Sequence, residues 1–215
     1  MIKKLLLFFL LSFALIGNVF GASFSTLTDN FNDNSIDTAK WGTDTDGGSI
    51  SEVNQEIEIS SNGEFSSQSN SYDLTGEQVT LKIIDTGTIS STGYQFDFAV
   101  NINWSYINSL HWEIWKGKLY AIYIVAGDET DILVGNYSLT AHKYLQIRES
   151  SGTIYWDYSS DGITWTNGAS VATPITITAL SVYILFDCDN ATTIKFDDFN
   201  ILPSVTLGLV NVITD

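Results

Sequence analysis

The chain has 215 residues, of which 44% are hydrophobic and 13% aromatic, which is typical of a globular protein and excludes an intrinsically disordered one. Its formal net charge is −16, with 25 acidic residues against 9 lysines and arginines, which argues against nucleic acid and anionic membranes as partners. A single cysteine, Cys188, excludes an internal disulfide.

The N-terminus has the layout of a secretory signal peptide. Lys3 and Lys4 precede an apolar run over residues 5–16, and the small residues Gly21 and Ala22 follow. The run is shorter than the about 20 residues that a membrane-spanning helix needs. We therefore expect a signal peptide over residues 1–22, one domain over 23–203 and a C-terminal tail over 204–215. The mature chain should have no membrane span, and the protein should be secreted, at the cell surface or periplasmic.

The rest of the chain predicts strands rather than helices. Runs rich in Val, Ile, Phe, Tyr and Trp are separated by Gly, Asn, Asp and Ser, and no long segment has a helical period. The expected strands cover residues 79–84, 94–104, 110–115, 119–125, 144–149, 153–158, 175–186 and 193–202. Residues 115–119 and 149–153 are expected to be hairpin turns, and 128–131 an acidic hairpin loop. This pattern predicts an all-β sandwich or barrel.

Side-chain alternation assigns two faces to the central strands, because successive residues of a strand point to opposite sides. The side expected to face the core consists, in the first of these strands, of Tyr94, Phe96, Phe98, Val100, Ile102 and Trp104. In the second strand it consists of Leu110, Trp112 and Ile114. On the other side, Asp97 and Asn101 either line a groove or meet solvent.

The next strands add a mixed polar and aromatic surface. His111, Glu113 and Trp115 share the side opposite to the core, and Tyr120 follows beside Trp115 after the turn. Sugars stack their apolar faces on aromatic rings while polar neighbours bind the hydroxyl groups. These four residues are therefore the candidate ligand-binding site. An ordinary amphipathic outer face remains the alternative.

Three segments resemble one family. Asp29, Phe31 and Trp41 lie in the first segment, residues 142–165 with Asp161-Gly162 form the second, and residues 194–201 form the third. In this order they resemble the first strand, central hairpin and last strand of the concanavalin A-like lectin/glucanase superfamily, including laminin-G-like domains. The resemblance spans residues 27–202. It implies a two-sheet antiparallel jelly-roll sandwich, with the first and last strands adjacent, and often sugar binding.

Family-sixteen glucanases of this fold carry Glu-x-Asp-x-Glu or Glu-x-Asp-x-x-Glu, which supplies the nucleophile and the acid/base of retaining hydrolysis. Glu56, Glu58 and Ser60 have the shorter spacing, but Ser60 replaces the second catalytic glutamate. We therefore expect no enzyme. The expected function is a secreted non-catalytic carbohydrate-binding, lectin-like module for an extracellular polysaccharide or cell-surface glycan. The alternative is a structural or adhesion protein of a cell envelope, virion or extracellular matrix.

The resemblance also implies a metal, since related jelly rolls hold a structural calcium where the first and last strands meet. Asp29 lies near the first strand, and Asp197 and Asp198 lie on the last. Calcium takes six to eight oxygen ligands, and neighbouring residues point to opposite faces, so only one of the latter two can join Asp29. No other cofactor is expected. The alternative is that Asp29 caps a turn and Asp198 is solvated.

Overall fold

The computed structural model describes residues 21–87, 95–187 and 192–204. Within these ranges the regular structure is β, apart from one 3₁₀ turn, η1 (Phe24–Thr26). No helix in this part of the chain has the length and apolar character that a membrane crossing requires. The predicted signal peptide and tail lie almost entirely outside the described residues, as does Cys188.

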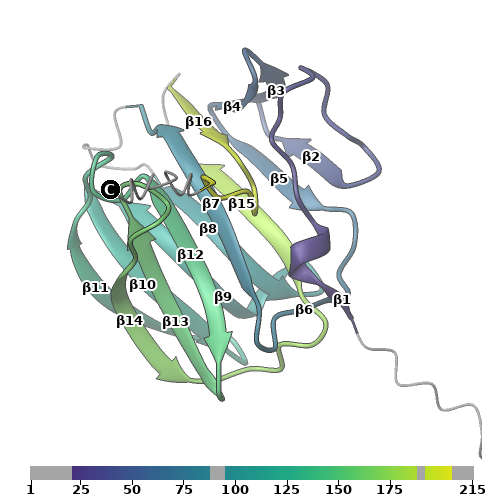
Figure 1. The fold of residues 1–215 in the computed structure, drawn as a ribbon. Helices are drawn as coiled ribbons and strands as arrows, with labels where there is room; N and C mark the ends of the chain where they lie inside the picture. The colour runs from purple at the N-terminus through teal and green to yellow at the C-terminus, as the bar shows by residue number, and fades with distance from the viewer. Residues whose placement is uncertain (1–20, 88–94, 188–191, 205–215) are drawn as a thin grey trace, which may run out of the picture.

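Two antiparallel sheets of seven strands each make up the sandwich (Figure 1). Sheet I has the order β11 (Asp128–Asn136), β10 (Lys118–Val125), β9 (Ser105–Trp115), β8 (Gln95–Ile102), β15 (Ser181–Asp187), β5 (Gly63–Ser67), β2 (Trp41–Thr45). Sheet II has the order β14 (Thr166–Ala172), β13 (Thr153–Ser159), β12 (Tyr144–Ser150), β7 (Gln78–Asp85), β16 (Thr193–Asp197), β4 (Glu56–Ser60), β3 (Ser49–Val53). A short parallel pair joins β1 (Ala22–Ser23) to β6 (Tyr72–Asp73). The predicted two-sheet jelly roll is confirmed.

The two ends of the domain meet as the sequence predicts. The Asp29 amide donates to the Phe199 carbonyl over 3.1 Å, and the Phe199 amide returns a bond of 2.8 Å to the Asp29 carbonyl. The contact is an isolated bridge, because the last strand, β16, ends at Asp197 and Asp198 takes a left-handed φ of 46°. The first and last segments are therefore neighbours without forming a continuous ladder.

Two buried tryptophans fasten the sheets to each other. Trp112 of β9 donates its indole N–H to the Gln146 carbonyl on β12, over 2.9 Å. In return, Trp156 of β13 donates to the His111 carbonyl on β9, over 3.0 Å. Both rings are fully buried, so these bonds satisfy indole groups that would otherwise be costly to desolvate. They hold β9 in place against sheet II.

The two turns that connect β9 to β10 and β12 to β13 have the backbone geometry that their residues predict. Lys116 and Gly117 have φ of 50° and 71°, and Ser151 and Gly152 have 53° and 78°. Two successive positive φ values define the type I′ turn, whose twist matches that of the flanking strands. The predicted hairpins β9–β10 and β12–β13 are confirmed.

Several expected boundaries were wrong, and most of the errors lie at the sheet edges. Residues 128–131 do not form a loop but begin strand β11, because the hairpin turns earlier, at Ala126 and Gly127. The strand expected from residue 175 starts only at Ser181. Strand β8 ends at Ile102, and Trp104, expected in the core, is 41% exposed because Asn103 and Trp104 take left-handed φ values in the turn. The sequence did not predict the four edge strands, which are β2, β3, β11 and β14. Their sequences are rich in Ser, Thr, Asp and Gly, and one side of each strand lacks a partner strand.

Candidate functional site

A line of acidic residues crosses the outer face of sheet I, perpendicular to the strands. Glu113 on β9 lies opposite Asp97 on β8, and Asp97 lies opposite Leu185 on β15. Leu185 in turn lies opposite Glu64 on β5, which faces Asp44 on β2. Directly opposite residues share a face, and adjacent strands are about 4.8 Å apart. We call Glu113, Asp97, Glu64 and Asp44 the acidic row.

Strand alternation explains why these side chains point outward. On β9, Leu110, Trp112 and Ile114 are fully buried in the core between the sheets, so the intervening residues must face away from it. The same rule places Asp97 opposite to the core residues Phe96 and Phe98. The hydrophobic pattern of two strands thus brings a carboxyl pair together on the outer face.

The Asp97 carboxyl group is fully buried although it lies on this outer face. Its Oδ2 accepts bonds from Gln95 Nε2 at 2.9 Å and from the Tyr106 hydroxyl at 3.2 Å. Its Oδ1 is buried with no hydrogen-bond partner among the described residues. Burial, followed by the negative charge of Glu113, raises the pKa of Asp97 to about 8. At neutral pH this carboxyl group therefore carries its proton.

Glu113 is partly exposed and forms the accessible half of the pair. Burial, followed by the charges of Asp131 and Glu129, raises the pKa of Glu113 to about 7. These two residues come from β11 and lie opposite outward-facing positions of β10. The segment predicted to be a solvated acidic loop is thus a strand that adds negative charge beside Glu113.

Tyr106 lies over the pair. It belongs to a stretch where the register between β8 and β9 shifts, so residues 106–108 have no partner on β8. Its ring makes edge contacts with His111 and Tyr183, with centroids 5.7 and 5.0 Å apart. Both the ring and the hydroxyl of Tyr106 therefore close the outer face above Asp97.

The four residues predicted to bind ligand all lie on this face, on β9 and β10. Glu113 faces Tyr120 directly, and Trp115 is 39% exposed with Lys116 Nζ 3.8 Å from its ring centroid. His111, expected on an exposed surface, is only 2% exposed, and burial lowers its pKa to about 3, so the imidazole is neutral. Glu113, Trp115 and Tyr120 stay predicted contacts, whereas His111 lies beneath Tyr106.

Sequence reasoning missed the partner of Glu113. Asp97 was placed on the correct face, but nothing local indicated that it would lie opposite Glu113. One signal was present: Ser109, His111 and Glu113 have the spacing of Glu-x-Asp-x-Glu, with the first two acids replaced. The motif was matched instead to Glu56, Glu58 and Ser60.

Glu56 and Glu58 have a different role. They lie on β4 in sheet II, and both carboxylates bind Lys195 Nζ, Glu56 at 2.8 Å. Hydrogen bonds from the two glutamates raise the pKa of Lys195. This pair is a charge-neutralising contact on the opposite side of the molecule from the acidic row.

Larger hollows lie on sheet II, and the carboxylates in their walls bind protein groups. Glu77 accepts from the Ser23 hydroxyl, and Glu149 accepts from the amides of Gly76 and Gly152. Pockets of about 510 and 340 Å³ share Gln78, Arg148 and Leu202 in their walls. Arg148 there forms an ion pair with Asp157. A smaller pocket of about 160 Å³ borders the acidic row at Asp44 and Glu64. Among the strand pairs that the structure describes, Asp97 and Glu113 on sheet I are the two carboxyl groups that have raised pKa values and lie directly opposite each other.

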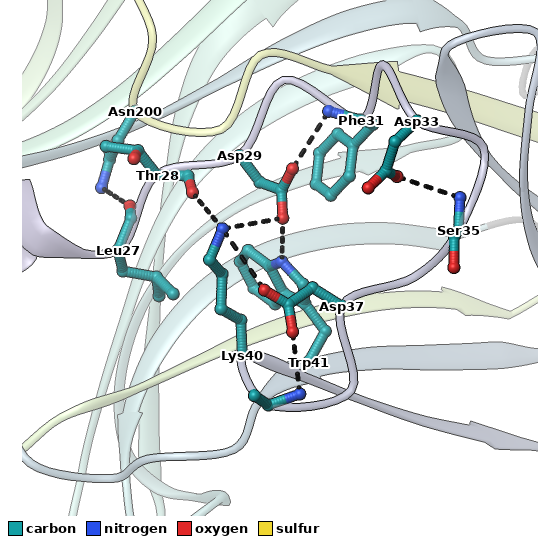
Figure 2. Close-up of polar contacts among 11 residues, drawn as sticks. Leu27, Thr28, Asp29, Phe31, Asp33, Ser35, Asp37, Lys40, Trp41 and Asn200 are labelled. Atoms are coloured by element: carbon teal, nitrogen blue, oxygen red, sulfur yellow. Dashed lines mark hydrogen bonds and ion pairs between the residues drawn. The ribbon is translucent and has the colours of Figure 1, made fainter.

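Asp29, the first of the predicted calcium ligands, is held by protein groups (Figure 2). Its Oδ1 accepts from the Phe31 amide at 3.1 Å, and its Oδ2 accepts from the Trp41 indole at 2.9 Å. Lys40 Nζ lies 3.5 Å from Oδ2. The carboxylate therefore caps the turn before Phe31 and anchors the Trp41 ring, as the alternative to a metal site had it.

Asp197 and Asp198 lie together on Lys82 and not on Asp29. Lys82 Nζ is 2.8 Å from Asp197 and 2.7 Å from Asp198. The two neighbours reach the same cation because the left-handed φ of Asp198 breaks the alternation of the strand. Among the residues that the structure describes, no group of three or more His, Cys, Asp or Glu could hold a metal ion. The calcium site stays a prediction, and the structure does not bring its three aspartates together.

Comparisons with known proteins were made by sequence and by structure. No protein-family model matches the chain, and no curated protein matches it. Among solved structures, a Bacillus licheniformis β-glucanase is similar over 80% of this chain and 94% of its own, with 13% identity and a TM-score of 0.57. A prokaryotic β-1,3-1,4-glucanase (lichenase) from a mouse hindgut metagenome covers 80% and 94%, with 9% identity and a TM-score of 0.59.

A non-specific endo-β-1,3(4)-glucanase from glycoside hydrolase family 16 covers 80% of this chain and 88% of its own, with 10% identity and a TM-score of 0.56. The fold is the concanavalin A-like jelly roll. At identities of 9–13% the likeness shows the fold alone.

The comparison contradicts the function expected from the sequence. The sequence predicted a non-catalytic lectin-like module without enzyme activity, with a structural or adhesion protein as the alternative. The similar structures are instead glucanases. The error has a structural origin. The expectation depended on Ser60 of β4, whereas the facing carboxyl groups of this chain lie on β8 and β9 of the other sheet.

Proposed function

We propose that the chain is a secreted enzyme that cleaves an extracellular polysaccharide at the Asp97–Glu113 pair. The observation that carries this proposal is the direct opposition of two carboxyl groups, both with raised pKa, on adjacent strands. Perturbed carboxyl groups facing each other are characteristic of sites that transfer protons.

The strand geometry favours a retaining mechanism. Side chains directly opposite each other on adjacent strands have Cβ atoms about 4.5–5.5 Å apart. Retaining glycosidases hold their two carboxyl groups about 5–5.5 Å apart, whereas inverting enzymes leave about 6.5–9.5 Å for a water molecule. Carboxyl groups carried on such neighbouring positions can reach the shorter separation, which favours a covalent glycosyl-enzyme intermediate.

The environments of the two groups suggest their roles. Glu113 is accessible and has the lower pKa of the pair, so its carboxylate attacks the anomeric carbon as the glycosidic bond breaks. Asp97 holds a proton at neutral pH and donates it to the leaving oxygen. It then takes a proton from the water that releases the sugar from Glu113, which restores both groups.

Access to Asp97 requires Tyr106 to move, because the phenol covers the carboxyl group. Residues 106–108 lack ladder partners on β8, so the backbone that carries Tyr106 is held less firmly than its neighbours. An entering sugar would displace the ring and take over the hydroxyl contact to Asp97.

The substrates to test first follow from the similar structures, which are enzymes acting on β-glucans. An extracellular or periplasmic location agrees with the signal-like N-terminus. The secreted form of the chain is incubated with mixed-linkage and β-1,3-glucans, and new reducing ends are measured. Proton NMR of the first product formed should show the retained anomer.

Two variants and one control test the assignment. Glu113→Gln and Asp97→Asn should each lower kcat by about 10³-fold or more. Glu58→Gln removes a carboxylate of the same kind from the opposite sheet, leaves Glu56 on Lys195, and should leave kcat unchanged. Turnover that survives in Glu113→Gln, or no turnover of any glycan, would contradict the proposal.

A further inference from the structure

The outer face of sheet I carries six carboxyl groups without a cation. They are Asp44, Glu64, Asp97, Glu113, Glu129 and Asp131. Among the described residues, every ion pair involves Lys40, Lys82, Arg148 or Lys195, and none of these four contacts the six. Lys116 and Lys118 lie at the Trp115 end of this face, but Lys116 rests on the Trp115 ring and Lys118 binds Asn136. The six carboxyl groups therefore form no ion pair with a described residue.

This arrangement has an energetic cost that the fold does not relieve. Like charges on neighbouring strands repel each other. The Asp97 side chain, fully buried between Glu113 and Leu185, leaves Oδ1 without a hydrogen-bond partner in the described part of the chain. Glu113 and Glu129 both have pKa values raised by burial and then by Asp131. A cationic ligand would reduce the repulsion between these carboxylates and would supply a partner for Asp97 Oδ1.

A single metal ion does not fit this surface. Calcium or magnesium needs several oxygens converging on one point at 2.0–2.6 Å, as a general rule. The acidic row instead runs over five strands, from β9 to β2, so its ends are about 19 Å apart at the usual strand spacing. Charges that follow each other in a line suit a linear polymer with a positive group on successive units.

We infer that the acidic row binds a cationic glycan, a polymer of β-linked glucosamine with free amino groups, across the strands of sheet I. This inference rests on the proposed function and names its substrate class. Protonated amino groups meet Asp44, Glu64 and Glu113. Once Tyr106 has moved aside, the amine nearest Asp97 meets the carboxyl oxygen that now lacks a partner.

The β10 end of the row supplies the apolar half of such a site. Tyr120 lies directly opposite Glu113, and Trp115 is the next outward residue of β9. The Trp115 ring already holds the ammonium group of Lys116 at 3.8 Å, so its face attracts cations. A glucosamine unit can displace Lys116 and stack its C–H face on the ring while its amine reaches the row.

Binding is measured with the Glu113→Gln variant, which does not turn the ligand over. The probes are the glucosamine hexamer, its fully N-acetylated counterpart and cellohexaose, compared by calorimetry. The glucosamine hexamer should bind about tenfold more tightly than the other two at low salt, because only it carries charge. The advantage should vanish in about 0.5 M salt, where charges are screened over a few ångströms.

Second-site variants localise the effect. Asp44→Asn with Glu64→Gln, added to Glu113→Gln, should remove most of the preference, and Glu58→Gln on sheet II should not. Equal affinity for the three hexamers, or a preference that survives in the Asp44 and Glu64 variant, overturns the inference. If neutral β-glucans are cleaved through Glu113 while the glucosamine hexamer binds no better, the proposed function stands and the inference alone fails. If the hexamer binds at the row without any cleavage, the reverse holds.

Discussion

The two outer faces of the sandwich differ in whether their carboxylates form ion pairs. On sheet II, Lys82 forms ion pairs with Asp197 and Asp198, and Lys195 forms ion pairs with Glu56 and Glu58. Arg148 pairs with Asp157 and stacks on the Tyr155 ring at 3.9 Å. On sheet I, the acidic row and its neighbours on β11 have no such cation among the described residues.

The pairing on sheet II serves the fold. Burial by itself lowers the pKa of Lys82, but hydrogen bonds and charge from Asp197 and Asp198 outweigh it, and the net pKa is raised. The ammonium group is therefore held charged between segments that are distant in sequence, β7 and β16. Charges arranged in this way add some stability to the fold.

The unpaired carboxyl groups of sheet I lower stability instead. A protein can keep such groups where they take part in binding or chemistry, and strongly perturbed pKa values tend to mark those places. The difference between the faces therefore indicates which of the two sheets performs the function, although larger pockets lie on the other one.

Asp97→Asn should have the largest effect, because it removes a fully buried carboxyl group whose ionisation is unfavourable in the folded chain. The pKa of Asp97 is about 8 in the folded chain against 3.8 for the unperturbed group, so between these values the folded state holds a proton that the unfolded state loses. Stability from this group is present at low pH and is lost as pH rises through about 8.

The variant has no proton to lose. It should match the native chain near pH 4 and exceed it by a few kcal/mol at pH 8, in the free energy of unfolding. Urea unfolding of both proteins at pH 4, 6 and 8 measures this, and parallel pH profiles would show that Asp97 is not the responsible group.

Lys82→Met should have the second largest effect on stability, because it removes the cation shared by Asp197 and Asp198 on sheet II. It leaves Asp197 and Asp198 close together without their cation, both only partly exposed. We expect a loss of about 2 kcal/mol in the free energy of unfolding, less than for a fully buried pair. Lys118→Met serves as the control, since Lys118 binds Asn136 and no carboxylate. Equal losses in the two variants would mean that the pairing on sheet II contributes nothing specific.

Trp115→Ala tests whether the outer face of sheet I binds the substrate, with a smaller expected effect. The ring is 39% exposed, so the domain should stay folded with nearly unchanged Tm. Loss of a stacking ring should raise KM for the cleaved glycan about fivefold, and kcat should change little. A collapsed fold would place Trp115 among the structural residues, and an unchanged KM would remove it from the binding surface.

Calcium should have the smallest effect. Asp29 is engaged by Trp41 and Lys40, and Asp197 and Asp198 by Lys82, so an ion would have to displace a lysine. We expect calcium or a chelator to move Tm by about 1 °C or less. A larger rise that Asp29→Ala abolishes would establish the calcium site predicted from the sequence.

Local sequence determined the parts of this fold that depend on neighbours along the chain. Alternation with period two identified the core face of β8 and β9, since each residue of a strand points opposite to the one before. Lys116-Gly117 and Ser151-Gly152 defined their own type I′ turns through backbone preference. The outward direction of Glu113, Trp115 and Tyr120 followed from the same patterns.

Only the tertiary structure decided which of these residues meet. The opposition of Asp97 and Glu113 is a matter of register across a turn that contains an irregular stretch, which shifts the pairing and is not visible in the alternation. The edge strands form because the neighbouring strand of the sheet offers hydrogen-bond partners, and their own residues have little preference for a strand. The cations of sheet II reach carboxylates more than a hundred residues away, and whether a charge is paired is set by packing that no local pattern encodes.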